Sequence, residues 1–220
     1  MAKSMSLLWG AGSPPCWRVM ITLEEKRLQG YKRKLLSFQK GEHKSQEVLE
    51  LNPRGQLPAF RHGDVVVNES TAACLYLENR FQSQGNRLIP DSPAEQALVF
   101  QRMMEGLTLT DRLNSVIYYD LLVPEEERHD STLKRSKETL STELQLWEGY
   151  LWLQAPTWLD CGFSSFRLSA GRFPKLAKYY SLLKERPSIK TTGSSALHQI
   201  LIRTPLVELI NILQKNLLCV

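Results

Sequence analysis

The stretch NPRGQLPAFRHGDVVVNES, residues 52–70, places a proline inside what otherwise has the pattern of a β-strand. Proline has no N–H and cannot continue a strand ladder, so Pro58 indicates an edge, a bulge or a cis peptide bond. A cis bond before Pro58 turns the N–H and C=O of Leu57 outward, where an extended peptide pairs with them as a further strand. Ser70 then opens an apolar helical run, and a helix N-terminus attracts a carboxylate. The stretch therefore predicts a binding site for a small acidic peptide.

The segments around this stretch alternate between strand and helix patterns. Strands are predicted at residues 6–9, 32–38, 56–60 and 65–67, the last two forming a hairpin. Helices with apolar residues at helical spacing are predicted at 15–28, 45–51 and 70–81. This order, βαβαββα, is that of an α/β thioredoxin-like domain, which we expect to occupy residues 1–81.

Residues 82–93 form a polar connector that contains glycine and proline, and they are the predicted linker between two domains. Ser92 then provides an N-cap, Pro93 the first helical position and Glu95 an acid at the third. The helix that starts there is predicted to run to about residue 119, and further helices are predicted at about 131–153 and 174–185, the last stopped by Pro187. We therefore expect an all-α C-terminal domain over residues 94–220, irregular after residue 153.

The composition excludes several classes of function. With 220 residues and 42% hydrophobic content the chain can bury a core, but no window offers the roughly 18 consecutive apolar residues of a membrane span. The net charge of +5 is interspersed with acids, which argues against nucleic acid as a partner. The four cysteines are scattered and the histidines lack metal-ligand spacing, so we expect a reduced, cytoplasmic protein without a metal site.

Ser13 and Cys16 lie between the first predicted strand and the first predicted helix. They have the spacing of a Cys-x-x-Cys redox pair in which serine replaces the nucleophile, so dithiol chemistry is not expected. Two interpretations of Ser13 remain open. Either it donates a hydrogen bond to a thiolate supplied by a ligand, an effect of about 1 to 3 kcal/mol, or it only caps the helix, with Pro14 at the first helical position.

Three runs of the sequence together match one known family: LLWGAGSPPCWRVMITLEEK (7–26), KGEHKSQEVLELNPRGQLPAF (40–60) and NES (68–70) before an apolar helix. They resemble the cytosolic glutathione transferases, and among the serine-type members the rho class of fishes. The resemblance covers residues 1–153 and resumes over 173–190. It implies a cytoplasmic homodimeric enzyme of detoxification. Such an enzyme conjugates glutathione, a co-substrate rather than a bound cofactor, to hydrophobic electrophiles.

The resemblance also implies roles for individual residues. Ser13 matches the serine that hydrogen-bonds the glutathione sulfur. The remaining glutathione-binding positions are matched by His43 and Lys44 for the glycyl carboxylate, Gln56 and Leu57 before the family's cis-proline Pro58, and Glu69 and Ser70 for the γ-glutamyl amine and carboxylate. Met104, Tyr118 and Tyr119 lie on the long helix that lines the electrophile pocket in the family.

Several of these residues also have an ordinary structural interpretation. His43 and Lys44 on a polar loop are ordinarily solvated. Arg18 can assist an anion, but an arginine on the exposed side of a helix is usually only a surface residue. Cys74 lies on an apolar helix face and is expected in the core. Core packing is also the expected role for at least half of the group Met103, Met104, Tyr118 and Tyr119.

The second domain departs from the family pattern. After the helix that ends near residue 153, the family has a central buried helix, and residues 154–172 leave no room for it. We therefore expect a C-terminal domain that lacks this helix. Two alternatives to conjugation follow. The first is a glutathione-binding or scaffolding protein with little turnover. The second is a redox enzyme that uses Cys16, which the serine at position 13 disfavours.

Overall fold

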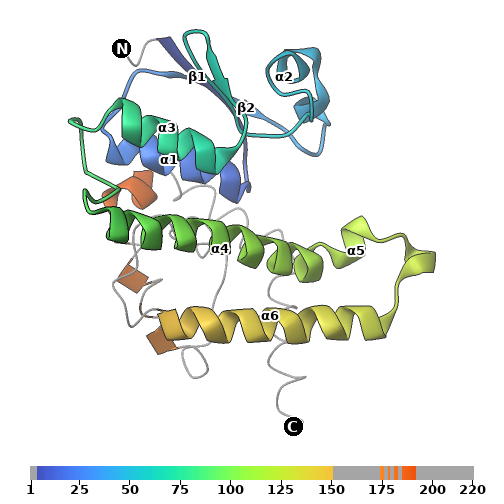
Figure 1. Ribbon diagram of the computed structural model, residues 1–220. Coiled ribbons are helices and arrows are strands. Elements are labelled where there is room, and N and C mark those ends of the chain that lie inside the picture. The colour runs from blue at the N-terminus through green and yellow to red at the C-terminus, as the bar shows by residue number, and fades with distance from the viewer. Residues whose placement is uncertain (1–3, 151–173, 176–177, 179–180, 183–184, 192–220) are drawn as a thin grey trace. The chain divides into compact units, whose positions relative to one another are not determined.

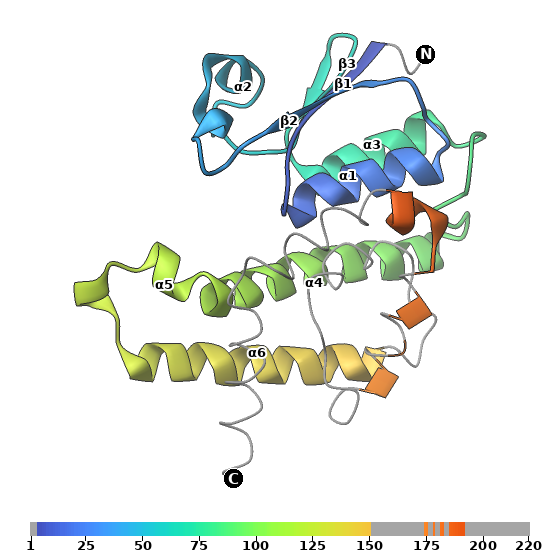
Figure 2. The same ribbon diagram turned by 180° about the vertical axis from the view of Figure 1, so that it is seen from behind.

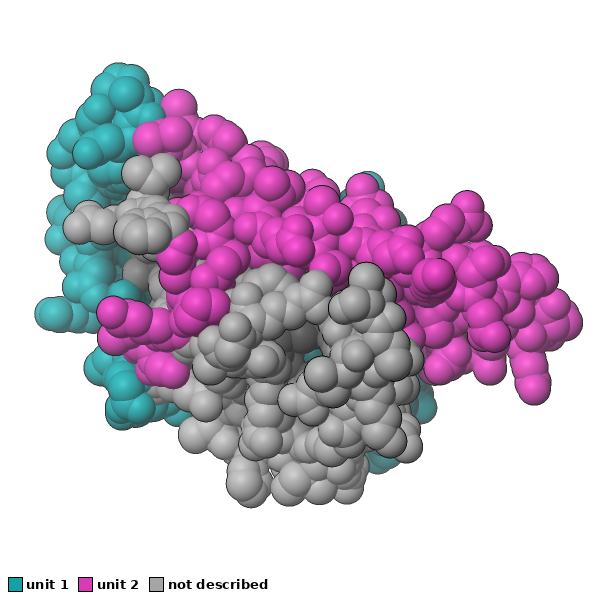
Figure 3. Space-filling view, turned by 90° about the horizontal axis from the view of Figure 1, so that it is seen from below, with its two compact units in different colours: residues 1–96, 185–199 teal, residues 97–184, 200–220 magenta. Residues whose placement is uncertain are grey.

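The computed structural model describes residues 4–150, 174–175, 178, 181–182 and 185–191, and the chain divides into two compact units (Figures 1 and 3). Unit 1 comprises Met1–Gln96 and Glu185–Gln199, and unit 2 comprises Ala97–Lys184 and Ile200–Val220. The sequence gives no sign that residues after 185 belong with the N-terminal unit. The domain limits expected from the sequence, 1–81 and 94–220, stay a prediction.

Unit 1 contains the strands and helices predicted for a thioredoxin-like domain, in the predicted order. They are β1 (Met5–Gly10), α1 (Pro14–Glu25), β2 (Lys32–Leu36), the short 3₁₀ helix η2 (Glu42–Lys44), α2 (Gln46–Leu51), β3 (Ala59–His62), β4 (Val65–Val67) and α3 (Ser70–Arg80). The predicted βαβαββα fold is therefore confirmed.

The four strands form one mixed sheet in the order β2-β1-β3-β4. β1 pairs parallel with β2 and antiparallel with β3, and β3 pairs antiparallel with β4. Helices α1 and α3 lie side by side along one face of this sheet (Figures 1 and 2). Val48 of α2 joins a separate buried cluster with Leu8, Leu57 and Ala59. The stretch 52–70 thus runs from the end of α2 to the start of α3, and its Leu57 shares a buried cluster with Cys16 near the start of α1.

Helix α1 ends three residues before the predicted residue 28. Arg27 takes a left-handed conformation with φ of 52°, and the Leu28 N–H donates to the Leu23 carbonyl at 2.8 Å. This is the hydrogen-bond pattern of a Schellman cap, in which a left-handed residue reverses the chain and a following apolar residue packs back on the helix. Leu28 is accordingly buried, so its apolar character marked the cap rather than another helical turn.

The prediction that Pro58 lies inside a strand is wrong, whereas the cis peptide bond between Leu57 and Pro58 is confirmed. Strand β3 begins at Ala59, which pairs with Leu8 of β1. Because proline offers no N–H to the ladder, the pairing stops one residue after it.

The connector after α3 is fixed to unit 1 by buried charges. Lys26 and Glu78 are both almost fully buried, with Nζ and Oε2 2.8 Å apart. The second carboxylate oxygen of Glu78 accepts the N–H groups of Leu88 and Ile89, at 3.2 and 3.4 Å. A Cβ on Gly85, whose φ is +66°, would lie 2.3 Å from the Glu25 carbonyl oxygen. Only glycine therefore allows this close approach.

Unit 2 consists mainly of two long helices that run in opposite directions side by side (Figures 1 and 2). They are α4 (Pro93–Ile117), whose residues 93–96 belong to unit 1, and α6 (Asp130–Tyr150). The two are connected through α5 (Tyr119–Leu122) and the 3₁₀ helix η3 (Glu125–Glu127). The predicted start of α4 at Pro93 is confirmed. The guanidinium of Arg102 on α4 lies 3.6 Å from the ring centre of Tyr150 on α6, a cation–π contact between the two helices.

The later part of the sequence is described only in pieces. Residues 174–175, 178 and 181–182 are helical, as predicted for 174–185, and a new helical segment at 187–191 begins with Pro187. The end of the second predicted helix and the expected loss of the central helix fall on residues 151–173, which lie outside the described residues.

Candidate functional site

Ser13 is the N-cap of α1. Its Oγ accepts a hydrogen bond from the Cys16 N–H at 3.4 Å, and both Pro14 and Pro15 lie in the first helical turn. A serine hydroxyl has one hydrogen to donate and two lone pairs, so accepting the capping bond leaves its hydrogen available to an acceptor outside the helix. The two interpretations of Ser13, helix cap and thiolate donor, are therefore compatible in one geometry.

Cys16 is fully buried, and its Sγ accepts a hydrogen bond from the Gly10 N–H at 3.4 Å. Burial raises the pKa of the Cys16 thiol to about 11, although the hydrogen bonds with Ser13 and Gly10 act in the opposite direction. The thiol is thus protonated at neutral pH and is a poor nucleophile. Cys74 is buried as well, which confirms its predicted place in the core.

His43 and Lys44 lie on η2 beside the turn that residues 52–55 form. Lys44 Nζ donates to the Arg54 carbonyl at 3.0 Å, and a Cβ on Gly55 would lie 2.7 Å from the Lys44 side chain. The His43 ring packs against Phe38, with ring centres 5.2 Å apart. Among the described residues nothing hydrogen-bonds His43 Nδ1, although that atom is buried. The His43 ring is therefore held by packing, whereas the exposed Lys44 side chain is held by its hydrogen bond to Arg54.

The segment before the cis-proline is anchored from one side. Asn52 Nδ2 donates to the Gln56 carbonyl at 2.9 Å, and the Gln56 side chain is exposed. In the described part of the chain, neither the N–H nor the C=O of Leu57 has a hydrogen-bond partner. Because unpaired backbone groups of this kind pair with an extended chain, the geometry agrees with the strand-like peptide binding predicted at Leu57.

Ser70 and Glu69 mark the N-terminus of α3. Ser70 is buried and is the first helical residue, whereas the Glu69 side chain is 73% exposed and lies 3.1 Å from the Arg54 guanidinium. The expectation that Arg18 is only a surface residue is wrong. Arg18 is half-buried and donates from Nη1 to Ser70 Oγ at 2.9 Å. Sequence reasoning missed this pair because only the packing of α1 against α3 joins residues 52 positions apart.

Comparisons with known proteins identify the family. The model of the glutathione S-transferase N-terminal domain matches residues 12–80. The chain is 59% identical over 207 residues to glutathione S-transferase A of Pleuronectes platessa, and the match covers 87% of this chain and 92% of that protein. The chain belongs to the glutathione S-transferase family.

Solved glutathione transferase structures share the fold. A glutathione S-transferase from the Antarctic clam Laternula elliptica is 36% identical, with a TM-score of 0.76 over 89% of this chain and 94% of that one. The transferase URE2P8 of Phanerochaete chrysosporium, solved with oxidized glutathione, is 24% identical with a TM-score of 0.75, covering 91% and 98% of the two chains. At that identity the second likeness shows the fold alone.

The alignment with the Pleuronectes transferase also leaves some positions of that protein unmatched. It spans 207 positions, but 87% of the 220 residues of this chain is only about 191 residues, so about 16 positions of the relative have no counterpart here. In total these positions amount to the length of one helix, since 16 residues make a helix of about 24 Å.

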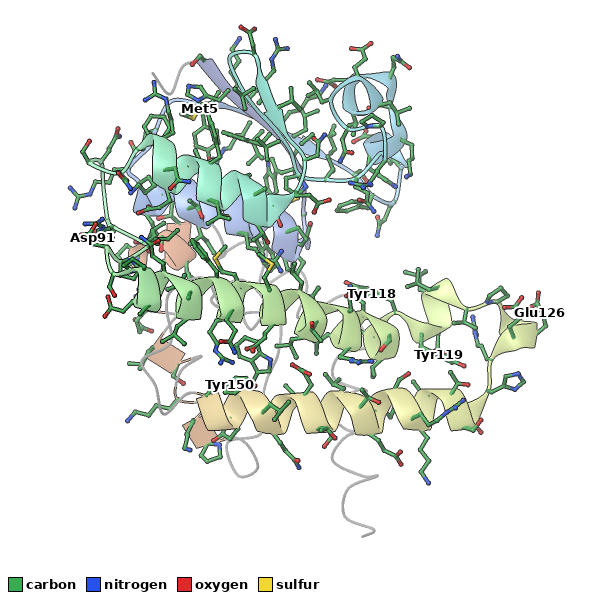
Figure 4. All side chains as sticks on the ribbon, viewed as in Figure 1. Met5, Asp91, Tyr118, Tyr119, Glu126 and Tyr150 are labelled. Atoms are coloured by element: carbon green, nitrogen blue, oxygen red, sulfur yellow. The ribbon has the colours of Figure 1, made fainter. Side chains whose placement is uncertain are left out.

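The three residues expected at the electrophile pocket of this transferase lie in unit 2, whereas all the expected glutathione-binding residues lie in unit 1. The expectation that Tyr118 and Tyr119 lie on the long helix is wrong, because α4 ends at Ile117; Tyr118 is the N-cap of α5 and Tyr119 its first residue (both labelled in Figure 4). Met104 and Tyr118 are 49% and 37% exposed, whereas Tyr119 is buried. The Tyr119 hydroxyl accepts the His129 N–H at 2.9 Å and lies 3.2 Å from the His129 carbonyl. Tyr119 therefore fixes the loop before α6.

Two other kinds of feature are absent from the described residues. No three His, Cys, Asp or Glu side chains there gather in a way that holds a metal ion. No helix in the same residues is both long and apolar enough to span a membrane.

Proposed function

We propose that this glutathione S-transferase uses Ser13 to stabilise the thiolate of glutathione for attack on electrophilic small molecules. The observation that carries the proposal is the position of Ser13, whose hydroxyl accepts the capping N–H of Cys16 and keeps its hydrogen for an acceptor. The glutathione thiol loses its proton to solvent, and the thiolate forms a bond to an electrophilic carbon as a leaving group departs. The α1 N-terminus favours the same negative charge.

The other ends of glutathione fit the groups around Ser13. Lys44 and His43 offer cationic or donor groups for the glycyl carboxylate, and the unpaired backbone of Leu57 before Pro58 suits the cysteinyl amide. Glu69 suits the γ-glutamyl ammonium, and Ser70 suits its carboxylate. Gln56 lies beside Leu57 with its side chain exposed. These assignments follow the family resemblance, and the geometry above supports them.

We assign Met104 and Tyr118 to the electrophile pocket and keep Tyr119 as a third member that acts by holding the loop at His129. The substrates are hydrophobic electrophiles, and the role is detoxification in the cytoplasm by a homodimer. Sedimentation equilibrium tests the homodimer directly, because a monomer has a mass of 25.2 kDa and a dimer twice that.

A second candidate function is a glutathione-binding protein with little turnover. The sequence after residue 153 favours it, because residues 154–172 leave no room for the family's central helix, and about 16 positions of the Pleuronectes transferase have no counterpart here. Family membership supports conjugation as the main proposal. A standard aromatic-halide conjugation assay separates the two, because retention on immobilised glutathione without turnover supports the binding protein.

Replacing Ser13 tests the proposed mechanism. Both Ser13→Ala and Ser13→Gly remove the hydroxyl, and we expect kcat at pH 7 to fall about 10- to 100-fold, because the thiol pKa of bound glutathione rises by about one to two units. The Kd for glutathione changes little. Glycine caps a helix almost as well as serine, whereas alanine loses about 1 kcal/mol of stability. Equal loss of turnover in both variants thus separates chemistry from capping, and unchanged kcat in the glycine variant contradicts the assignment.

A further inference from the structure

The hydrogen bond between Arg18 and Ser70 joins two helices at the expected carboxylate end of the glutathione site. We propose that Arg18 is a positioning residue, which holds Ser70 as a hydrogen-bond donor to the γ-glutamyl carboxylate and places a positive charge behind it. The inference rests on the proposed function, because it takes glutathione as the ligand.

The direction of the hydrogen bond follows from the chemistry of the two groups. A guanidinium carries only donors, whereas a hydroxyl carries one donor hydrogen and two lone pairs. In the bond of 2.9 Å, Ser70 Oγ must therefore accept from Arg18 Nη1. The hydroxyl hydrogen of Ser70 is left for another acceptor, and no described residue takes it in a hydrogen bond. Because Ser70 Oγ accepts from Arg18, Ser70 acts as a hydrogen-bond donor toward a ligand.

The surroundings of Ser70 suit an anion as that acceptor. Ser70 is buried at the first position of α3, a helix of 11 residues whose first turn contains no acidic side chain. The unpaired N–H groups of a first turn and the helix dipole both favour a negative charge. The guanidinium of Arg18 stays charged at all physiological pH values. A carboxylate bound here can therefore accept hydrogen bonds from the Ser70 hydroxyl and from the first N–H groups of α3. The Arg18 guanidinium adds a positive charge without direct contact.

The same helix α1 serves both ends of the proposed ligand. Ser13 lies at its N-cap, and Arg18 follows five residues later, roughly 7.5 Å along the axis at 1.5 Å per residue. Ser13 faces the sulfur in the proposed function, and Arg18 supports the residue that holds the γ-glutamyl carboxylate. Because α1 packs directly against α3, a single rigid pair of helices sets the spacing of these two groups.

Two glutathione analogues test this role. 4-Aminobutyryl-cysteinylglycine lacks the γ-glutamyl carboxylate, and glutaryl-cysteinylglycine lacks the amine but keeps that carboxylate. In Arg18→Gln, we expect the Kd values of glutathione and of the glutaryl peptide to rise about tenfold, which corresponds to one lost charged interaction. The Kd of the aminobutyryl peptide and kcat at saturating glutathione stay within about twofold. Calorimetric titration and steady-state kinetics measure both quantities.

Three further variants make the result specific. Arg135→Gln, which changes an exposed arginine of α6, leaves all three Kd values unchanged. Arg18→Lys keeps the charge and one donor and recovers part of the loss. In a Ser70→Ala background, Arg18→Gln raises the Kd of glutathione by a smaller factor than in the wild type, because only the effect of its charge remains.

The opposite results overturn the inference in distinguishable ways. If Arg18→Gln weakens all three peptides by the same factor, or only lowers the melting temperature, Arg18 is a structural link between helices. If this variant does not fold, Arg18→Lys supports the same comparison, and an unchanged preference for the carboxylate overturns the role. If the wild-type protein binds glutathione and the Arg18 variants still prefer the peptides that keep the γ-glutamyl carboxylate, this inference alone is overturned. A wild-type protein that does not bind glutathione overturns the proposed function as well.

Discussion

At the residue scale, Ser13 and Cys16 lie within one helical turn but suit different chemistry. Ser13 suits stabilisation of a ligand thiolate, and Cys16 is the thiol on which the redox alternative depends. Ser13 Oγ accepts the capping N–H of Cys16 at the helix N-terminus, whereas the Cys16 thiol is buried and accepts a hydrogen bond from Gly10. Burial decides the difference, because a thiolate in an apolar environment is costly. The redox alternative therefore has no ionised protein thiol at this position at neutral pH.

Replacing Cys16 by serine tests that conclusion. We expect kcat/KM for conjugation to stay within about threefold of the wild type, because the reacting sulfur belongs to glutathione in the proposed function. A loss of about a hundredfold or more would restore the redox hypothesis. The matching measurement is thiol labelling of the native protein at pH 8, in which Cys16 and Cys74 react slowly and become reactive after denaturation.

The same two thiols predict a loss of stability in alkali. Burial raises the pKa of Cys16 and of Cys74 from 9.0 to about 11. Because the folded-state pKa lies above the unfolded one, the unfolded chain loses protons first, and stability falls as pH rises from about 9 to 11. The loss is on the order of 2 kcal/mol per thiol. Urea denaturation between pH 8 and 11 measures it, and Cys74→Ala should flatten the curve.

At the scale of elements, Glu25 at the end of α1 joins three segments of unit 1. Its carboxylate accepts hydrogen bonds from Asn86 at 2.6 Å, Ser188 at 2.6 Å and Arg186 at 2.7 Å. The helical segment 187–191 is thereby fixed to the thioredoxin-like fold, although it lies about a hundred residues after the connector. This network gives residues 185–191 their place in unit 1.

Replacing Glu25 by glutamine should cost about 2 kcal/mol at pH 7, the range of hydrogen bonds to a charged group. Burial alone raises the pKa of Glu25, but the hydrogen bonds from Ser188, Asn86 and Arg186 outweigh it and hold the pKa below 4.5. The stabilisation is therefore full above about pH 4.5 and is lost as pH falls through the lower folded-state pKa. Urea denaturation at a series of pH values from 7 downward should show the difference in stability between the two proteins shrink as pH falls below about 4.5.

Glu24→Gln is the matched control for this experiment, because Glu24 precedes Glu25 and accepts none of the three side-chain bonds. Its free energy of unfolding should stay within about 0.5 kcal/mol of the wild type. A Glu25→Gln protein as stable as the wild type at pH 7 would show that the network contributes nothing net to folding.

At the scale of the whole molecule, ligand binding and folding are linked. Glutathione at about 100 times its Kd should stabilise the folded state by about 2.7 kcal/mol, which raises the melting temperature by roughly 5 to 10 °C for a chain of this length. Cysteinylglycine, which lacks the γ-glutamyl group, should give a smaller shift at equal concentration. Calorimetric melts measure both. An equal shift with the two peptides would contradict γ-glutamyl recognition at Glu69 and Ser70.

Most of unit 1 could be predicted because its signals are local. Apolar periodicity placed β1, α1, β2 and α3 to within a few residues, and proline and glycine marked the turns. The errors came from interactions that the local pattern does not contain. The strand ladder, which needs N–H groups, ended at Ala59 rather than including Pro58, and the left-handed cap at Arg27 ended α1 before residue 28.

The sequence by itself determined the order of elements, the N-cap at Ser13 and the start of α4 at Pro93, since each depends on neighbouring residues. At Pro58 the residues left an edge, a bulge and a cis bond open, and the family resemblance favoured the cis bond. Tertiary structure alone decided that Arg18 meets Ser70, that Glu25 binds Arg186 and Ser188, and that Cys16 is too buried to ionise. Partners 52 to 163 positions apart meet only through packing, and burial is a property of the folded chain. The stretch 52–70 predicted a peptide site, and the packing of α1 on α3 places the Arg18 guanidinium against Ser70 at the end of that stretch.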